Sequence, residues 1–237
     1  MDTILFDLDG TLLPMDMEVF TKGYFGELAR AYAPYGYEAG PLVETVWKGV
    51  KAMAANDGSC DNGARFWNTL AGRFGDTVLA QRAELERFYE TDFHKVRAYT
   101  QENPLAAPCV RKLREKGYTV ALATNPIFPF EGTRARLSWI GLCPEDFALV
   151  TAYENTGHCK PNLNYYRGVL KELGKDPDDC LMIGNDVVED ACVTALGMDF
   201  YLVCDNLINP NGEDLSVYRR GTFAECAAYL DTLPKRS

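Results

Sequence analysis

The segment ILFDLDGTLL, residues 4–13, changes character at its fourth residue. The three apolar residues that open it are typical of a short buried strand, and the acids and glycine that follow are typical of a loop. Asp7 and Asp9 are two residues apart, so their side chains project to the same side of an extended chain. Their mutual repulsion is costly unless a cation lies between them or one of them stays protonated. Gly10 allows a sharp turn, including a left-handed one. The segment alone fits either a functional loop or an ordinary acidic turn.

The second half of the chain alternates short apolar runs with helical patterns. Apolar runs at residues 119–123, 147–150, 180–184 and 200–203 predict four further strands. The clearest helical stripe between them, over residues 163–173, begins just after Pro161 and ends at Gly174, as helices often do. Strands alternating with helices indicate βαβ units. The sequence therefore predicts an α/β fold with a doubly wound, Rossmann-like, mostly parallel five-stranded sheet that helices cover on both faces.

Residues 15–99 carry helical patterns and almost no strand patterns. Apolar side chains recur there at spacings of three and four in four stretches, the last over residues 79–93, which predicts a small helical bundle. A length of 237 residues suits one full domain and a smaller companion. We therefore expect an α/β core domain of residues 1–14 plus 100–237, with a helical-bundle cap domain inserted at residues 15–99. Because ligands of open parallel sheets bind beyond the carboxyl ends of the strands, this insert would cover the binding crevice.

The charge and composition of the chain limit the classes of partner that we expect. The chain has 24 Lys and Arg against 34 Asp and Glu, a formal net charge of −10, and no basic run longer than a pair. Nucleic-acid-binding proteins normally carry a clustered basic surface, so we expect no nucleic-acid partner. No apolar stretch reaches 18 residues and no export signal is visible, so we expect a cytoplasmic protein without a membrane partner. The eight cysteines lack metal-site spacing and are expected to be mostly buried, reduced thiols. We expect the protein to be a monomer or a weak dimer.

Three further polar clusters lie where expected strands end or a helix begins. TNP, residues 124–126, follows the second strand, Lys160 precedes a helix, and GNDVVED, residues 184–190, ends the fourth strand. The carboxyl ends of parallel strands share one edge of a sheet, so all of these clusters would meet the first segment there. Each also has an ordinary explanation as a turn, a surface lysine or a helix cap. Three acids within residues 186–190 also suit a hard cation that prefers oxygen ligands.

In this order, the four clusters resemble the four motifs of the haloacid dehalogenase-like (HAD) hydrolase superfamily, and FDLDGTLL is a strong signature of it. The expected helical bundle resembles the type-1 cap of that superfamily. The resemblance implies a phosphoric monoester hydrolase: a Mg²⁺-dependent phosphatase that acts on a small phosphorylated metabolite through an aspartyl-phosphate intermediate. A phosphosugar mutase of the same superfamily uses the same motifs and stays open, as does a non-catalytic phosphoacceptor or binding module. A dehalogenase is disfavoured, because dehalogenases of this fold lack the second acid of the first motif and this chain has Asp9 there.

The resemblance also implies roles for individual residues. Asp7 would be the nucleophile, and Asp9 would protonate the leaving oxygen and then deprotonate the attacking water. Lys160 would neutralise Asp7 and the transferring group, and Thr124 would donate to a phosphoryl oxygen. The implied catalytic set is Asp7, Asp9, Thr124 and Lys160, and the implied phosphate-binding set is Gly10, Thr124, Asn125 and Lys160. Mg²⁺ would lie between Asp7, the backbone carbonyl of Asp9 and an acid of the fourth motif.

The fourth motif departs from the family pattern. The family usually places a metal-binding Asp directly after the glycine that ends the strand, and this chain has Asn185 there. Either Asn185 supplies a neutral carbonyl ligand, or Asp186 has taken over the metal with Asp190 as second ligand or as an orienting group. We favour Asp186, because a divalent site beside phosphate benefits from another anionic ligand. The implied metal set is Asp7, Asp9, Asp186, Asn185 and Asp190.

The substrate should depend on side chains of the expected cap, but periodicity cannot separate residues that face the crevice from the core of the cap. Trp47, Arg65 and Trp67 are candidates to meet a ring or an anionic group. Tryptophan at helical spacing is more often a core residue.

Overall fold

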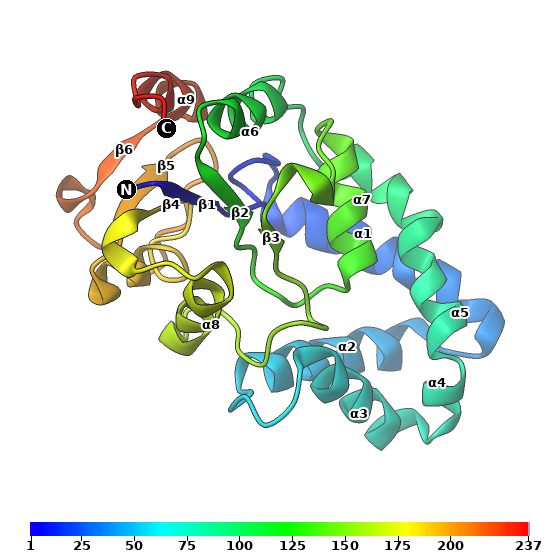
Figure 1. The fold of residues 1–237 in the computed structure, drawn as a ribbon. Helices are drawn as coiled ribbons and strands as arrows, with labels where there is room; N and C mark the ends of the chain where they lie inside the picture. Colours follow the sequence, from blue (N-terminus) through cyan, green and yellow to red (C-terminus); the bar gives the residue numbers. More distant parts are fainter. Residues whose placement is uncertain (237) are drawn as a thin grey trace.

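A parallel sheet of six strands forms the centre of the computed structural model, which describes residues 1–236 (Figure 1). The spatial order is β3-β2-β1-β4-β5-β6, and all neighbouring strands are parallel. The α/β, doubly wound expectation is confirmed, but the expected count of five strands is wrong by one. The strands are β1 (Thr3–Phe6), β2 (Thr119–Leu122), β3 (Leu149–Val150), β4 (Cys180–Gly184), β5 (Asp199–Val203) and β6 (Arg219–Gly221).

The strand that the sequence did not indicate is β6, at the edge of the sheet. It has three residues, pairs only with β5 and carries Arg219 and Arg220, both exposed. Strand prediction depends on an apolar run, which this segment lacks. Short, charged edge strands are common because they discourage pairing with other chains.

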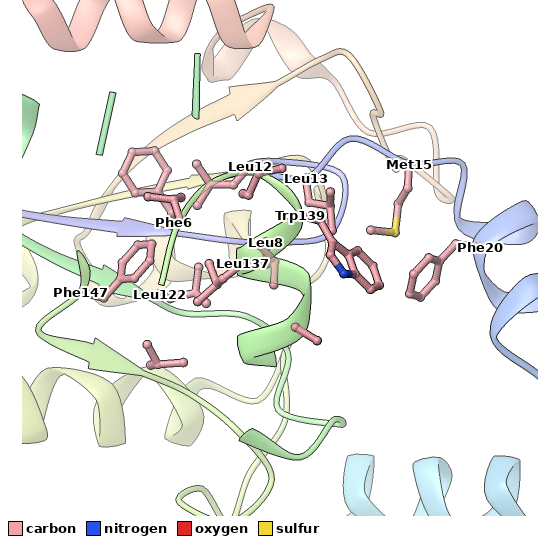
Figure 2. Packing of buried hydrophobic residues seen from close by; sticks show 14 of the residues in the cluster. Phe6, Leu8, Leu12, Leu13, Met15, Phe20, Leu122, Leu137, Trp139 and Phe147 are labelled. Carbon is pink, nitrogen blue, oxygen red and sulfur yellow. The ribbon is translucent and has the colours of Figure 1, made fainter. Parts of the chain in front are cut away.

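Alternate residues of β1 face opposite sides of the sheet. Because the residues on both sides are apolar, helices cover both faces. Ile4 and Phe6 are fully buried in one core, to which α6 (Ala106–Glu115), α7 (Phe130–Trp139) and α9 (Phe223–Asp231) contribute. Figure 2 shows part of this core, with Phe6, Leu122 and Phe147 together near β1 and β2. Leu5 is buried in a second core with α8 (Leu163–Leu173) and the 3₁₀ helix η6 (Ala191–Leu196). Three further 3₁₀ segments follow α6 in the sequence: η4 (Pro144–Asp146), η5 (Pro177–Asp179) and η7 (Leu215–Val217).

The segment between β1 and α6 is helical, and Figure 1 shows its helices gathered beside α7 on one side of the sheet. Three expected helices are confirmed as α1 (Met17–Tyr32), α2 (Ala39–Ala54) and α3 (Asn62–Phe74). The continuous fourth helix expected over residues 79–93 is wrong, because the backbone leaves the helical conformation at Gln81 and Thr91. The pieces are α4 (Thr77–Ala80), α5 (Arg82–Glu86), η2 (Arg87–Glu90) and η3 (Asp92–Tyr99), and η1 (Ala33–Tyr35) follows α1.

The sheet brings the polar clusters to one edge. The backbone N–H of Asp7 bonds to the carbonyl of Ile183 at 2.9 Å, so the first segment stays beside β4 past the end of β1. The N–H of Ala123 bonds to the carbonyl of Phe6 at 2.8 Å, which keeps the Thr124 loop beside the first segment. Residues 7–11, 124–126 and 184–190 therefore begin at neighbouring carboxyl ends of β1, β2 and β4.

Two further features concern the cysteines and the helices. Within residues 1–236 all eight cysteines are free thiols, and four of them are buried. No helix in this described part of the chain is long and apolar enough to cross a membrane.

Candidate active site

Lys160 joins two acids of the first and fourth clusters. Its Nζ donates to Oδ1 of Asp7 at 2.8 Å and to Oδ1 of Asp190 at 2.6 Å, and all three side chains are buried. Burial acts against the charged ammonium, but the two carboxylates outweigh it and raise the pKa of Lys160 well above its ordinary value. Lys160 therefore keeps its charge and offsets part of the negative charge around Asp7.

The expected nucleophile, Asp7, lies at the end of β1 and is almost fully buried. Burial, with smaller contributions from Asp190 and Asp9, raises the pKa of the Asp7 carboxyl above its ordinary value despite the contact with Lys160. Any further positive charge placed beside Asp7 would favour its ionised form.

Asp9 is held by a residue that the sequence did not indicate. Its Oδ2 forms an ion pair with Arg136 of α7, and its Oδ1 is buried without a hydrogen-bond partner. Arg136 is fully buried and also donates from Nη2 to Oγ1 of Thr133 at 3.2 Å. Its guanidinium carbon lies 4.2 Å from the ring centroid of Phe128, at cation–π distance. In the sequence, Arg136 looks like an ordinary helix arginine, and nothing local reveals the partner 127 residues away.

Asn185 is tied to the first cluster by its side-chain amide. Its Oδ1 accepts from the hydroxyl of Thr11 at 2.9 Å, and its Nδ2 donates to the carbonyl of Asn206 at 2.7 Å. Gly10 has a φ of +87°, the left-handed turn that the sequence allowed, and a Cβ there would lie 2.3 Å from Nδ2 of Asn185. Only glycine leaves room for this amide.

The acids of residues 186–190 form a compact turn. Oδ1 of Asp186 accepts from the backbone N–H groups of Val188 at 2.7 Å and Glu189 at 2.9 Å. Oδ2 of Asp190 accepts from the N–H of Asp186 at 3.1 Å while Oδ1 contacts Lys160. Asp186 and Asp190, the two fourth-motif acids of the expected metal set, line the same cavity as Asp7 and Asp9.

Glu189 is a further residue of this site that the sequence analysis did not select. Its Oε2 accepts from Nδ2 of Asn125 at 2.9 Å, which connects the second and fourth clusters. Burial raises the pKa of Glu189 to about 8, with Asp190 and Asp186 adding to the effect. Thr124 also lines the cavity, and its backbone carbonyl accepts from the hydroxyl of Tyr165 at 2.9 Å. The signal for Glu189 was present as one of three acids in the fourth cluster.

The donor set fits a hard divalent cation. Within residues 1–236 no three His, Cys, Asp or Glu side chains are already arranged as a metal cluster. Mg²⁺ usually needs only one or two protein carboxylates, because it keeps several waters and binds substrate phosphate. The buried, partnerless Oδ1 of Asp9 and the carboxylates of Asp7 and Asp186 line one cavity, and all are oxygen donors.

This polar edge opens into a cavity of about 280 Å³. Its other walls come from α1, α2 and α3, Tyr89, residues 127–129, Tyr153 and Ile208. Trp47 and Trp67 both line the cavity, Trp67 buried and Trp47 44% exposed. Arg65 is not among the lining residues and pairs with Asp57 at 3.0 Å instead. Two of the three candidates for substrate contact therefore face the cavity.

Comparison with known proteins connects this arrangement to a family. A phosphoglycolate phosphatase of Rhodobacter capsulatus is 27% identical over 204 residues, covering 84% of this chain and 82% of that protein. A glyceraldehyde 3-phosphate phosphatase of Methanothermobacter thermautotrophicus is 28% identical over 227 residues, covering 90% and 93%. The crystal structure of a HAD phosphatase from Thermococcus onnurineus has the same fold, with a TM-score of 0.59, 20% identity and coverage of 97% and 98%. The family model for haloacid dehalogenase-like hydrolases matches residues 1–191. Because that match covers most of the 237 residues, this chain belongs to the haloacid dehalogenase-like hydrolase family.

Proposed function

We propose that this protein is a Mg²⁺-dependent phosphatase that hydrolyses a small phosphate monoester through an aspartyl-phosphate intermediate. The observation that carries the proposal is the contact between Lys160 and Asp7 beside Asp9, at the carboxyl end of the central strand. A carboxylate next to a permanent positive charge can approach an anionic phosphate that would otherwise repel it. The phosphatase names of the two curated relatives support the same reaction class.

In the first step, an oxygen of Asp7 attacks phosphorus, and the bond from phosphorus to the leaving oxygen breaks. The leaving oxygen takes its proton from Asp9, which we assign to the partnerless Oδ1 because Oδ2 is paired with Arg136. Lys160 holds the Asp7 carboxylate and offsets negative charge on the transferring group.

In the second step, water attacks the phosphorus of the aspartyl-phosphate while the carboxylate of Asp9 accepts a proton from that water. Inorganic phosphate leaves and the Asp7 carboxylate is regenerated. Gly10, Thr124 and Asn125 are proposed to bind the phosphoryl oxygens, as the family resemblance implies, and Thr124 and Asn125 line the cavity beside Asp7.

We propose Asp7, the backbone carbonyl of Asp9 and Asp186 as the metal ligands, and Asp190 as the group that orients Asp186 and Lys160. Mg²⁺ bound there would supply positive charge that offsets the repulsion between nucleophile and phosphate. Asn185 is the less favoured ligand, because both groups of its amide already bond to Thr11 and Asn206. Residues 15–99 are proposed as a cap domain over residues 1–14 and 100–237, and the lining of the cavity by α1–α3 supports this division.

The test compares the wild-type protein with Asp7→Asn, using p-nitrophenyl phosphate with and without Mg²⁺. We expect phosphate release by the wild-type protein only with Mg²⁺, and a loss of roughly 10³-fold or more in Asp7→Asn. Asp178→Asn, the same change at an exposed carboxylate, is the matched control and should keep wild-type activity. Turnover retained by Asp7→Asn would contradict the nucleophile. Isomerisation of a phosphosugar without phosphate release would show a mutase, and tight phosphate binding without turnover would show a binding module.

A further inference from the structure

The cavity beyond Asp7 and Asp9 has two chemically different ends. One end carries the carboxylates, Thr124 and Asn125, and the other is walled by aromatic and aliphatic side chains of three helices. The wall includes Phe20 and Phe25 from α1, Val50 from α2, Phe66 and Trp67 from α3, and Phe128. Among the described residues that line this cavity there is no Lys, Arg or His. The charged side chains among these described lining residues are all acids at the site end.

Several polar atoms of the wall already have hydrogen-bond partners within the protein. The hydroxyls of Tyr24 and Tyr89 bond at 2.9 Å, and Nε1 of Trp67 donates to the hydroxyl of Tyr153 at 3.1 Å. The hydroxyl of Tyr153 in turn donates to Oε1 of Glu86. Burial raises the pKa of Tyr24 to about 12, so its hydroxyl stays neutral. A ligand therefore meets rings and hydrocarbon there, with few polar groups left to satisfy.

The arginines near the wall are also engaged elsewhere. Arg136 pairs with Asp9, and Arg82 lies over the Trp67 ring while its Nε donates to Glu86 at 2.9 Å. Neither is a lining residue. A carboxylate or second phosphate placed against this wall would lose its hydration and gain no cation, which is unfavourable.

Resting on the phosphatase proposed above, we infer that the substrate is a phosphate monoester whose leaving group is uncharged and apolar, an aromatic ring or a short hydrocarbon chain. Its phosphate binds at Asp7 and its apolar part lies against α1, α2 and α3. A volume of about 280 Å³ is near the lower end of small-molecule sites, roughly 300–1,000 Å³, so one ring or a short chain is the expected size. Phosphoglycolate, which names one relative's activity, carries a carboxylate for which this wall offers no partner.

The first experiment measures kcat/KM with Mg²⁺ for straight-chain alkyl phosphates from ethyl to hexyl, whose leaving alcohols have similar acidity. Burial of each added methylene should raise kcat/KM roughly threefold to fourfold until the cavity is filled. Phosphoglycolate should be at least about tenfold worse than propyl phosphate. A flat or falling series, or a preference for phosphoglycolate, would overturn the inference. If no phosphate ester is hydrolysed at all, it is the proposed phosphatase activity that fails.

The second experiment places a positive charge on the wall. Val50→Lys should lower kcat/KM for hexyl phosphate at least about tenfold and shift the preference toward phosphoglycolate. Val19→Lys is the matched control, because Val19 is 49% exposed on α1 and does not line the cavity. This control should leave kcat/KM for both hexyl phosphate and phosphoglycolate unchanged. Turnover of ethyl phosphate by Val50→Lys checks folding.

If Val50→Lys does not fold, Trp47→Ala replaces it, since Trp47 is half-exposed and its loss removes part of the wall without burying a charge. It should reduce turnover of hexyl phosphate more than that of ethyl phosphate. Equal effects on both esters would contradict the assigned position of the leaving group.

Discussion

Arg136 and Asp9 form an ion pair at the carboxyl edge of the sheet, although they stand 127 residues apart in the sequence. The Arg136 side chain is fully buried, and its guanidinium lies over the ring of Phe128. Because Oδ2 of Asp9 is held in this way, Oδ1 is the oxygen left without a partner. The pair gives the second acid of the first motif one fixed orientation.

The first prediction concerns Arg136 as a positioning residue for Asp9. In Arg136→Met, kcat for ethyl phosphate should fall roughly 10²-fold, the size of a lost general-acid contribution. The loss for p-nitrophenyl phosphate should be much smaller, since its leaving group departs without a proton. Arg134→Met, the same change at a half-exposed arginine of α7, should affect neither substrate. Equal losses for both esters would reduce Arg136 to a purely structural role.

The second prediction separates the two candidate ligands of the fourth motif. Asp186→Asn should raise the Mg²⁺ concentration for half-maximal activity at least about tenfold and should weaken Mg²⁺ binding in calorimetry without substrate. Asn185→Ala should lower Tm, because it removes the bonds to Thr11 and Asn206, and should leave Mg²⁺ affinity within about twofold of wild type. Full Mg²⁺-dependent activity in Asp186→Asn together with its loss in Asn185→Ala would show that our assignment is wrong.

The third prediction concerns Gly10. Its φ of +87° is unfavourable for a residue with a Cβ, and that Cβ would collide with the amide of Asn185. Gly10→Ala should lower the free energy of unfolding by roughly 1–3 kcal/mol and reduce kcat. Gly40→Ala, in α2 with nothing within 4 Å of the added Cβ, should be neutral or stabilising. Denaturant unfolding of both variants measures the difference, and equal stabilities would contradict the collision.

The fourth prediction is a pH dependence of stability at Asp146. Burial acts to raise the pKa of this carboxyl, but the N–H of Cys143 at 3.0 Å and the guanidinium of Arg111 at 3.4 Å outweigh it and lower the pKa below its ordinary value. Arg114 adds a second contact at 3.3 Å. A lowered folded-state pKa stabilises the protein above the unfolded value of about 3.9, and this stabilisation is lost as pH falls further.

Asp146→Asn should therefore cost roughly 1–2 kcal/mol of unfolding free energy at pH 7, and the difference from wild type should shrink below about pH 4. Urea unfolding between pH 3 and pH 7 measures it, with Asp178→Asn at an exposed position as control. If the unfolding free energies of wild type and Asp146→Asn differ by the same amount at every pH in this range, the charge of Asp146 does not contribute to stability.

Much of the site was visible in the sequence because its residues stand where apolar runs stop. Asp7 and Asp9 follow β1, Thr124 follows β2 and residues 185–190 follow β4, and parallel strands bring such ends to one edge. Local periodicity and one rule of sheet geometry were sufficient to place these segments together. Lys160 also contacts Asp7, a partner that the family resemblance implied but that strand and helix patterns alone did not indicate.

The tertiary structure alone decided which helical side chains face the site. Arg136, Phe25 and Val50 have the spacing of ordinary amphipathic helices, and their neighbours come from elements distant in the sequence. The break of the fourth expected helix and the charged edge strand β6 have the same origin, because packing and strand pairing override local preference. The sequence thus determined the reacting groups of this protein through local order, whereas packing between distant segments shaped the apolar cavity beside them.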